Sequence, residues 1–206
     1  MRRIILALAV VGCIFAFSVP AHAEPYVSAY FGAAMPHDSD VSDNTGLGFT
    51  GEFTFDTGIA AGAKIGWMAR VAGLELDFNW HESDLDEITA DSFGVGVDAE
   101  MKVYSATANL IFRYPGETIR PYIGAGGGYF RGKINNVGVQ DETFAGDDDE
   151  EWGWQALAGI DFLVTPSISL FAEYKYSRVD FSFGGEIEVD IDYEVSQAYG
   201  GVSYHF

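Results

Sequence analysis

The sequence predicts an all-β protein, an eight-stranded antiparallel up-and-down transmembrane β-barrel preceded by a cleaved signal peptide. Three observations predict this fold. Apolar and polar residues alternate along many stretches, which is typical of strands with two different faces. The connections between these stretches alternate between long and short, which indicates an antiparallel meander. The chain begins with an export signal, and no later apolar run is long enough for a membrane helix.

Residues 1–23 have the pattern of a secretory signal peptide. Arg2 and Arg3 give it a positive start, and a continuous apolar run follows. The small residues Ala21 and Ala23 stand where a signal peptidase reads the chain. A membrane anchor is the alternative, but the apolar run is shorter than the roughly 20 residues that span a bilayer. The sequence therefore favours a cleaved signal.

Cys13 is the only cysteine and lies within the predicted signal peptide. A lipoprotein signal at this position is disfavoured, because the apolar run continues past it. The remaining domain, residues 24–206, is therefore expected to have no disulfide and no thiolate metal site. It has nine basic against 31 acidic residues, a net charge of −22, which disfavours nucleic acid as a partner.

The clearest alternation is in the stretch GLELDFNWH, residues 73–81. Leucine, phenylalanine and tryptophan fall on one face, and Glu75, Asp77 and His81 fall on the other. The same pattern recurs in KVYSATANLIFRY, WGWQALAGIDF and ISLFAEYKYS. It predicts eight strands, at about residues 26–35, 57–69, 73–82, 99–114, 121–134, 152–164, 168–181 and 193–206.

The long connections carry most of the negative charge. They run roughly through residues 36–56, 83–98, 135–151 and 182–192, and about 23 of the 31 acidic residues lie in or directly beside them. The short connections contain three prolines, which are tolerated where a missing N–H costs little. This division predicts one strongly acidic end of the molecule, with both termini at the other end.

Two all-β folds fit the alternation. A soluble sandwich turns its apolar face inward, whereas a membrane barrel turns it outward. The polar face favours a narrow barrel because it is rich in glycine, which leaves room beside large polar residues; these glycines are Gly62, Gly66, Gly124, Gly126, Gly128 and Gly159. Aromatic residues near the strand ends favour interfacial girdles; they are Trp80, Trp152, Trp154 and Tyr176 at the long-loop end and Trp67, Tyr114 and Tyr204 at the other.

The last stretch, AYGGVSYHF, has Val202, Tyr204 and Phe206 on one face. It resembles the C-terminal insertion signal of bacterial outer-membrane barrels. RPYIGAGGGYF and LFAEYKYSRVDF resemble strands of the outer-membrane β-barrel superfamily, which includes OmpA-like, opacity-type and porin-family barrels. The resemblance implies the outer membrane of a Gram-negative bacterium, periplasmic termini, extracellular long loops and recognition by the barrel assembly machinery. No peptidoglycan-binding domain is expected after the barrel.

For function, the resemblance implies a monomeric protein with a structural or surface-interaction role in adhesion, antigenicity or membrane integrity. A narrow porin-like channel is the alternative, and a lipid-modifying enzyme is less favoured. No G-x-S-x-G motif occurs, and His81, Glu82 and Ser83 alternate in direction along a strand, so they do not form a triad. The stretch GAGGGY lacks the final glycine of a dinucleotide fingerprint. We therefore expect no catalytic residue and no cofactor.

The acidic stretches DSDVSD and GDDDEE lack the ligand order of an EF-hand, so solvated loops are favoured over a defined metal site. Outer-membrane lipid is the expected partner, with divalent cations bridging these carboxylates to lipopolysaccharide phosphates. Inside the barrel, a charge is costly unless it is paired. The sequence therefore predicts a structural charge network that fills the lumen, formed by Lys64, Glu75, Asp77, Arg113, Asp161, Glu173 and Lys175.

Overall fold

The computed structural model of the chain describes residues 23–37, 39–43, 50–55, 57–90, 93–95, 98–139, 142–144, 148–184 and 188–206. Side chains are described for residues 23–37, 57–83, 101–133, 150–180 and 193–206. Apart from Ala23, the predicted signal peptide lies outside the described residues. No helix in these ranges is long and apolar enough to cross a membrane.

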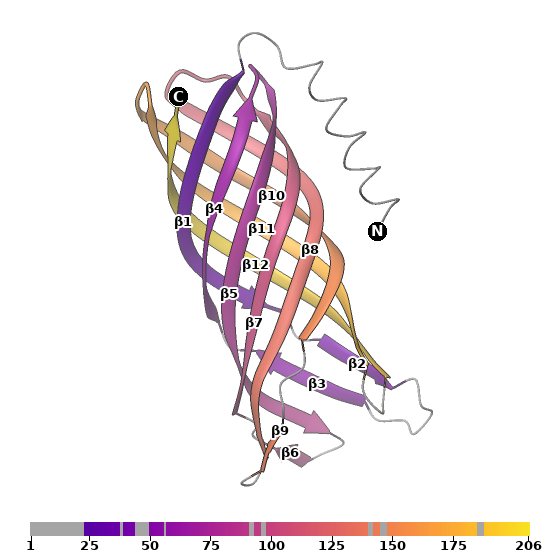
Figure 1. Ribbon diagram of the computed structural model, residues 1–206. Helices are drawn as coiled ribbons and strands as arrows, with labels where there is room; N and C mark the ends of the chain where they lie inside the picture. Colours follow the sequence, from indigo (N-terminus) through magenta and orange to yellow (C-terminus); the bar gives the residue numbers. More distant parts are fainter. Residues whose placement is uncertain are drawn as a thin grey trace, which may run out of the picture.

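Eight long antiparallel strands form a closed barrel (Figure 1). Each strand pairs with the next one along the chain, and the last returns to the first, with Tyr30 opposite Gly201. The backbone N–H of Phe206 adds a hydrogen bond to the carbonyl oxygen of Pro25 at 3.0 Å. This closure confirms the predicted fold. The strands are β1 (Glu24–Pro36), β4 (Gly58–Met68), β5 (Ala72–Ala90), β7 (Asp98–Arg113), β8 (Ile119–Val139), β10 (Asp148–Thr165), β11 (Ile168–Gly184) and β12 (Glu188–His205).

Several strands extend further at the long-loop end than the sequence predicts. The connections also contain four short strands: β2 (Ser39–Asp43), β3 (Thr50–Phe55), β6 (Phe93–Val95) and β9 (Glu142–Phe144). β2 and β3 form a hairpin between β12 and β5, where it continues the wall beyond the ends of β1 and β4. The predicted strand boundaries at the long-loop end were wrong because apolar and polar residues alternate only where one face of a strand meets lipid and the other meets the lumen.

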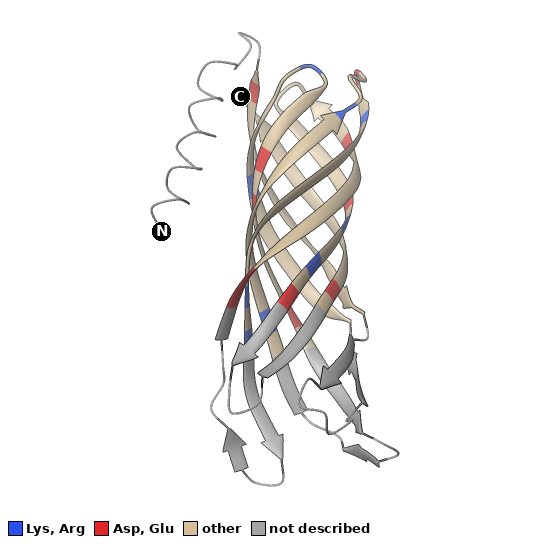
Figure 2. Ribbon diagram, turned by 90° about the vertical axis from the view of Figure 1, so that its right-hand side faces the viewer, with Lys and Arg blue, Asp and Glu red and all other residues tan. Residues whose placement is uncertain are grey.

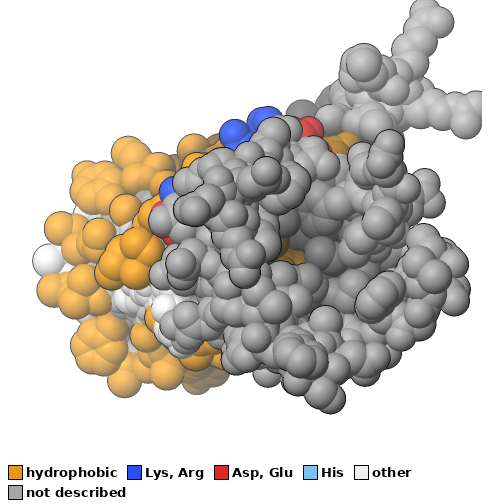
Figure 3. Space-filling model, turned by 90° about the horizontal axis from the view of Figure 1, so that it is seen from below, with side chains coloured by type: hydrophobic (Ala, Val, Ile, Leu, Met, Phe, Trp, Pro, Cys, Tyr) orange, Lys and Arg blue, Asp and Glu red, His pale blue; other side chains and the backbone are white. Residues whose placement is uncertain are grey.

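The two faces of the wall have opposite chemistry. Large apolar side chains face outward; Phe31, Ile123 and Trp152 are each more than 60% exposed. The inward positions of the same strands hold buried lysine, arginine, aspartate and glutamate side chains. Figure 3 shows hydrophobic side chains over the side of the wall that is visible in that view. This arrangement rules out the soluble sandwich, because so large an outward apolar surface requires lipid.

Glycines on the lumen side face aromatic rings on the neighbouring strand. Gly62 lies opposite Tyr30, and Gly66 lies opposite Tyr26. Gly159 and Gly201 have the same relation to Tyr122 and Phe171. At each of these four glycines a Cβ atom would overlap the facing ring. These four glycines therefore make space for aromatic rings, and three of the rings are those of tyrosines, the large polar residues for which the sequence predicted room.

Candidate functional site

The lumen is the site that the fold builds most completely. Its side chains form successive layers from the short-turn end, where Phe206 lies, to the long-loop end. All seven residues of the predicted charge network point into this space and are buried: Lys64, Glu75, Asp77, Arg113, Asp161, Glu173 and Lys175. The structure assigns them to separate groups and adds charged partners that were absent from the prediction.

The first layer lies at the short-turn end and centres on Asp161. Arg120 Nη2 is 2.6 Å from Asp161 Oδ2, and Arg113 Nη1 is 3.7 Å from the same oxygen. Arg113 also approaches Glu24, with Nη2 3.5 Å from Oε2. Arg113 therefore pairs with Asp161 and Glu24, and not with the carboxylates of neighbouring β5.

His205 completes this layer from β12. Its Nδ1 is 2.9 Å from Glu24 Oε1, and its Nε2 lies 2.9 Å from Ser169 Oγ and 3.4 Å from Arg120 Nη2. Because a guanidinium can only donate, Nε2 is the acceptor in the contact with Arg120. Nδ1 lies at ion-pair distance from Glu24 but has no hydrogen-bond partner among the described residues. Its side chain faces inward and is 3% exposed.

The second layer centres on Lys64. Its Nζ lies 2.6 Å from Glu173 Oε2 and 3.2 Å from Glu75 Oε1, so it joins β11 to β5 across the lumen. Tyr26 donates its hydroxyl proton to Glu75 Oε2 at 2.7 Å, and Tyr122 donates to Glu173 Oε2 at 2.8 Å. Each carboxylate thus has a cation and a hydroxyl, which is the condition for keeping such charges buried.

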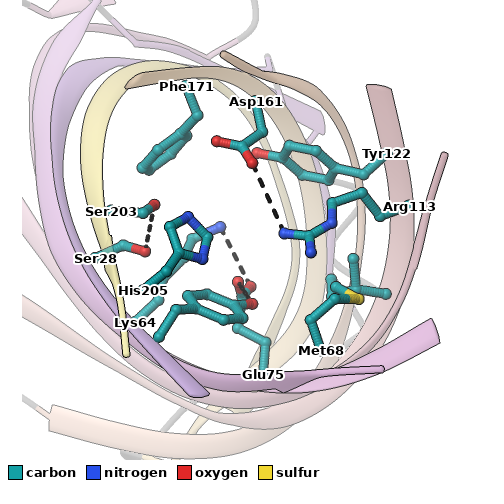
Figure 4. Close-up of a pocket in the computed structure, with 12 residues that line it drawn as sticks. Ser28, Lys64, Met68, Glu75, Arg113, Tyr122, Asp161, Phe171, Ser203 and His205 are labelled. Atoms are coloured by element: carbon teal, nitrogen blue, oxygen red, sulfur yellow. Dashed lines mark hydrogen bonds and ion pairs between the residues drawn. The ribbon is translucent and has the colours of Figure 1, made fainter. Parts of the chain in front are cut away.

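A small cavity of about 30 Å³ lies between these first two layers (Figure 4). Lys64, Glu75, Arg113, Asp161 and His205 point into it from different strands. Its volume is enough for about two water molecules, and its lining offers the polar partners that a buried water needs. It is far too small to be a solute pathway.

The third layer is the most deeply buried pair. Lys175 forms an ion pair with Asp77, and both side chains are 1% exposed. Tyr30 donates to Asp77 Oδ1 at 2.6 Å. The Lys175 ammonium also lies 4.9 Å from the ring centroid of Tyr199, a cation–π contact.

Neutral polar side chains form the next layer. His81 Nε2 is 2.9 Å from the hydroxyl of Tyr193, and Nδ1 contacts Asn79 and Gln197. Ser83 faces inward beside His81, whereas Glu82 lies at the outward position between them and pairs with Lys102. These three consecutive residues do not form a catalytic constellation, in agreement with their alternating directions.

Beyond this layer the lumen becomes apolar, which the sequence prediction missed. A buried cluster of apolar side chains fills the barrel toward the long-loop end. Its members occupy the inward positions of their strands, so the alternation of inward and outward residues along each strand could have identified them. They include Ala34, Ala60, Met101, Val103, Phe130, Val179, Tyr193 and Val195.

The other predicted features fall on the wall and in the loops. Val202, Tyr204 and Phe206 face outward, with 45%, 48% and 72% of their surface exposed. The cleavage prediction at Ala21 lies outside the described residues, as do the side chains of DSDVSD and most of GDDDEE. Within the described ranges, no group of three or more metal-ligating side chains is close enough to hold an ion.

An apolar outer wall around a charged, packed interior defines a transmembrane β-barrel of the bacterial outer membrane. The family model described as outer membrane protein beta-barrel domain matches residues 4–206, and the chain belongs to that family.

Solved barrels with the same fold have little sequence in common with it. Neisserial surface protein A (NspA) is 20% identical, with a TM-score of 0.55 over 88% of this chain and 97% of that one. OprG from Pseudomonas aeruginosa is 18% identical, with a TM-score of 0.64 over 89% and 96%. The protease OmpT from Escherichia coli is 9% identical, with a TM-score of 0.55 over 89% and 97%. A comparison with curated protein sequences gives no match.

Proposed function

We propose that this protein is a closed outer-membrane barrel with a structural or surface-interaction role. Its termini face the periplasm, and its acidic long loops face the outside of the cell. The observation that carries the proposal is the filled lumen: cross-lumen ion pairs are stacked beneath a buried apolar cluster. An eight-stranded barrel has an interior just wide enough for such side chains.

The packing opposes the two alternative functions. A channel needs a continuous polar path, whereas Val103 and Ala60 in the apolar cluster have no exposed surface. A lipid-modifying enzyme needs a nucleophile beside a base. His81 is bound instead to Tyr193, Asn79 and Gln197 in the lumen. Ser169 lies beside a base, 2.9 Å from His205, but the two residues are only 0% and 3% exposed, and His205 Nε2 is shared with Arg120, so a lipid has no access to the pair. Similarity to OmpT supports only a shared fold at 9% identity.

The closed lumen predicts negligible conductance. Purified protein refolded into planar bilayers should give no stable single-channel steps at moderate voltage. An open eight-stranded barrel of known conductance, inserted under the same conditions, controls for failed insertion. Reproducible steps from this protein, at a frequency that rises with the amount inserted, would favour the narrow channel.

Topology and assembly are tested together with an epitope inserted at residue 146 in the acidic stretch GDDDEE. On intact cells the epitope should bind antibody without lysis. Labelling of the full-length protein only after lysis would mean that the long loops face the periplasm.

Deleting Phe206 should reduce the surface signal and leave protease-sensitive protein in the periplasm, because we propose that the assembly machinery recognises Phe206 together with Tyr204. Normal assembly of the protein without Phe206 would show that the machinery does not need this residue.

A further inference from the structure

The carboxyl groups of the second layer outnumber its cations. Glu75 on β5 and Glu173 on β11 both approach the ammonium of Lys64, whose Nζ lies 3.2 Å from Glu75 Oε1 and 2.6 Å from Glu173 Oε2. None of the three side chains is more than 6% exposed. Figure 4 shows Lys64 and Glu75 at the small cavity between the first two layers. One positive charge is therefore shared by two groups that are each negative when ionised.

The first layer does not supply the missing positive charge. Arg120 pairs with Asp161 at 2.6 Å. Arg113 lies 3.7 Å from Asp161 and 3.5 Å from Glu24, and among the described residues it forms no ion pair with a carboxyl group of the second layer. A charge on His205 would also belong to the first layer, because its Nδ1 is 2.9 Å from Glu24 Oε1. This layer is thus balanced by its own residues.

The third layer is balanced as well, since Lys175 forms its ion pair with Asp77 and both side chains are 1% exposed. In Figure 2 acidic and basic positions lie at several heights along the described wall. Across the three layers, five carboxyl groups face four lysine and arginine side chains, and the excess carboxyl group belongs to the second layer. A buried carboxylate without a counter-charge is costly, and such a group neutralises itself by binding a proton.

The hydrogen bonds of this layer leave room for one proton. Glu75 accepts on both oxygens, because Tyr26 donates to Oε2 at 2.7 Å and Oε1 faces Lys64. At Glu173 a single oxygen, Oε2, receives both Lys64 and Tyr122. Glu173 Oε1 is buried and has no hydrogen-bond partner among the described residues. A protonated carboxyl group carries its proton on one oxygen and accepts on the other, so the Oε1 atom that no donor approaches can hold it.

We propose that Glu75 and Glu173 together bind one proton in addition to the charge of Lys64, so that the second layer has no net charge. Lys64 and the two tyrosine hydroxyls occupy the other carboxyl oxygens as donors, which leaves Glu173 Oε1 as the place for the proton. The inference rests on the closed lumen proposed above, which keeps water from solvating the second carboxylate. Conductance and proton binding are separate measurements, so failure of one is distinguishable from failure of the other.

Infrared spectroscopy of protein refolded in an ester-free detergent at about pH 7 tests the proposal, because exposed carboxyl groups are ionised there. A protonated carboxyl group gives a carbonyl band above the amide I region, and this band shifts in heavy water. The native protein should show it. Glu75→Gln and Glu173→Gln should each abolish it, because the carboxyl group that remains is then matched by Lys64. Lys64→Met should increase the band area about twofold, because both groups then need a proton.

Glu194→Gln makes the same substitution on the outer wall and should leave the band unchanged. Variants are compared when they migrate as folded barrels, and the two glutamine variants of the second layer decide the question if Lys64→Met does not fold. A band that persists in both of them would belong to another group and overturn the proposal. Absence of the band from the native protein would also overturn it. In that case, a higher urea midpoint in sodium or potassium chloride than in choline chloride would indicate a bound alkali cation instead.

Discussion

Replacing Lys175 with alanine should lower the free energy of unfolding by about 3–5 kcal/mol. Lys175 and Asp77 are each 1% exposed, and no other lysine or arginine forms an ion pair with Asp77 in the described part of the lumen. Without the ammonium, the carboxylate keeps the hydroxyl of Tyr30 as a hydrogen-bond partner, and the Lys64 ammonium is the remaining cation whose charge acts on it in the described part of the lumen. Urea unfolding of the refolded barrel in micelles, followed by the gel-mobility difference between folded and unfolded forms, measures the loss.

The matched control is Arg178→Ala on the outer face. Its pair with Glu194 is close, at 3.0 Å, but the side chains are 40% and 29% exposed. Partly exposed pairs contribute about 0–1 kcal/mol. Equal losses in the two variants would mean that water reaches Asp77 and solvates it. Lys175→Met combined with Asp77→Leu should recover most of the stability, because the orphaned charge is then absent.

The two arginines beside Asp161 should differ in how much they contribute to the stability of the barrel. Arg120 is 2.6 Å from this carboxylate and Arg113 is 3.7 Å away. Arg113→Ala leaves the closer cation in place, so it should destabilise the barrel less than Arg120→Ala. The sequence prediction included Arg113 and omitted Arg120, although Arg120 is the closer partner.

The sequence predicted which residues face the lumen because strand parity is a local property. Glu75 and Asp77 alternate with leucine and phenylalanine, and Lys175 alternates with tyrosines. Arg120 and Glu24 follow the same parity, but they lie just outside the predicted strands 121–134 and 26–35. An error of two residues in a boundary was enough to lose them.

The partners of each charge could not be predicted from the sequence, because they depend on strand tilt. Following the register from Lys64 around the wall leads through Ser28 and Ser203 to Ser169. Yet the Lys64 ammonium meets Glu173, four residues further along β11. Tilted strands place residues from different register rows at one height in a barrel. The extension of the strands at the long-loop end was missed for another reason. Beyond the membrane, neither face of a strand meets lipid, so apolar and polar residues no longer alternate.

Gly201→Val should lower the free energy of unfolding by about 1–3 kcal/mol, the usual effect of overpacking a filled interior. A Cβ atom at Gly201 would overlap the ring of Phe171 and lie 2.6 Å from the carbonyl oxygen of Ala29. The carbonyl belongs to the closing strand β1 and cannot retreat without disturbing the pairing of β1 with β12. Phe171 also lies beneath the ammonium of Lys64, 5.6 Å from its ring centroid, so a displaced ring disturbs the second layer.

The adjacent residue provides the control for this prediction. A Cβ atom at Gly200 would meet nothing within 4 Å, because Gly200 faces the lipid. Gly200→Val adds a β-branched side chain to an apolar surface, which suits a strand, so it should be neutral or slightly stabilising. The same urea and gel-mobility assay compares the two variants. If Gly200→Val destabilises the barrel as much as Gly201→Val, the effect arises from the backbone of β12, and the ring of Phe171 is not what requires glycine at 201.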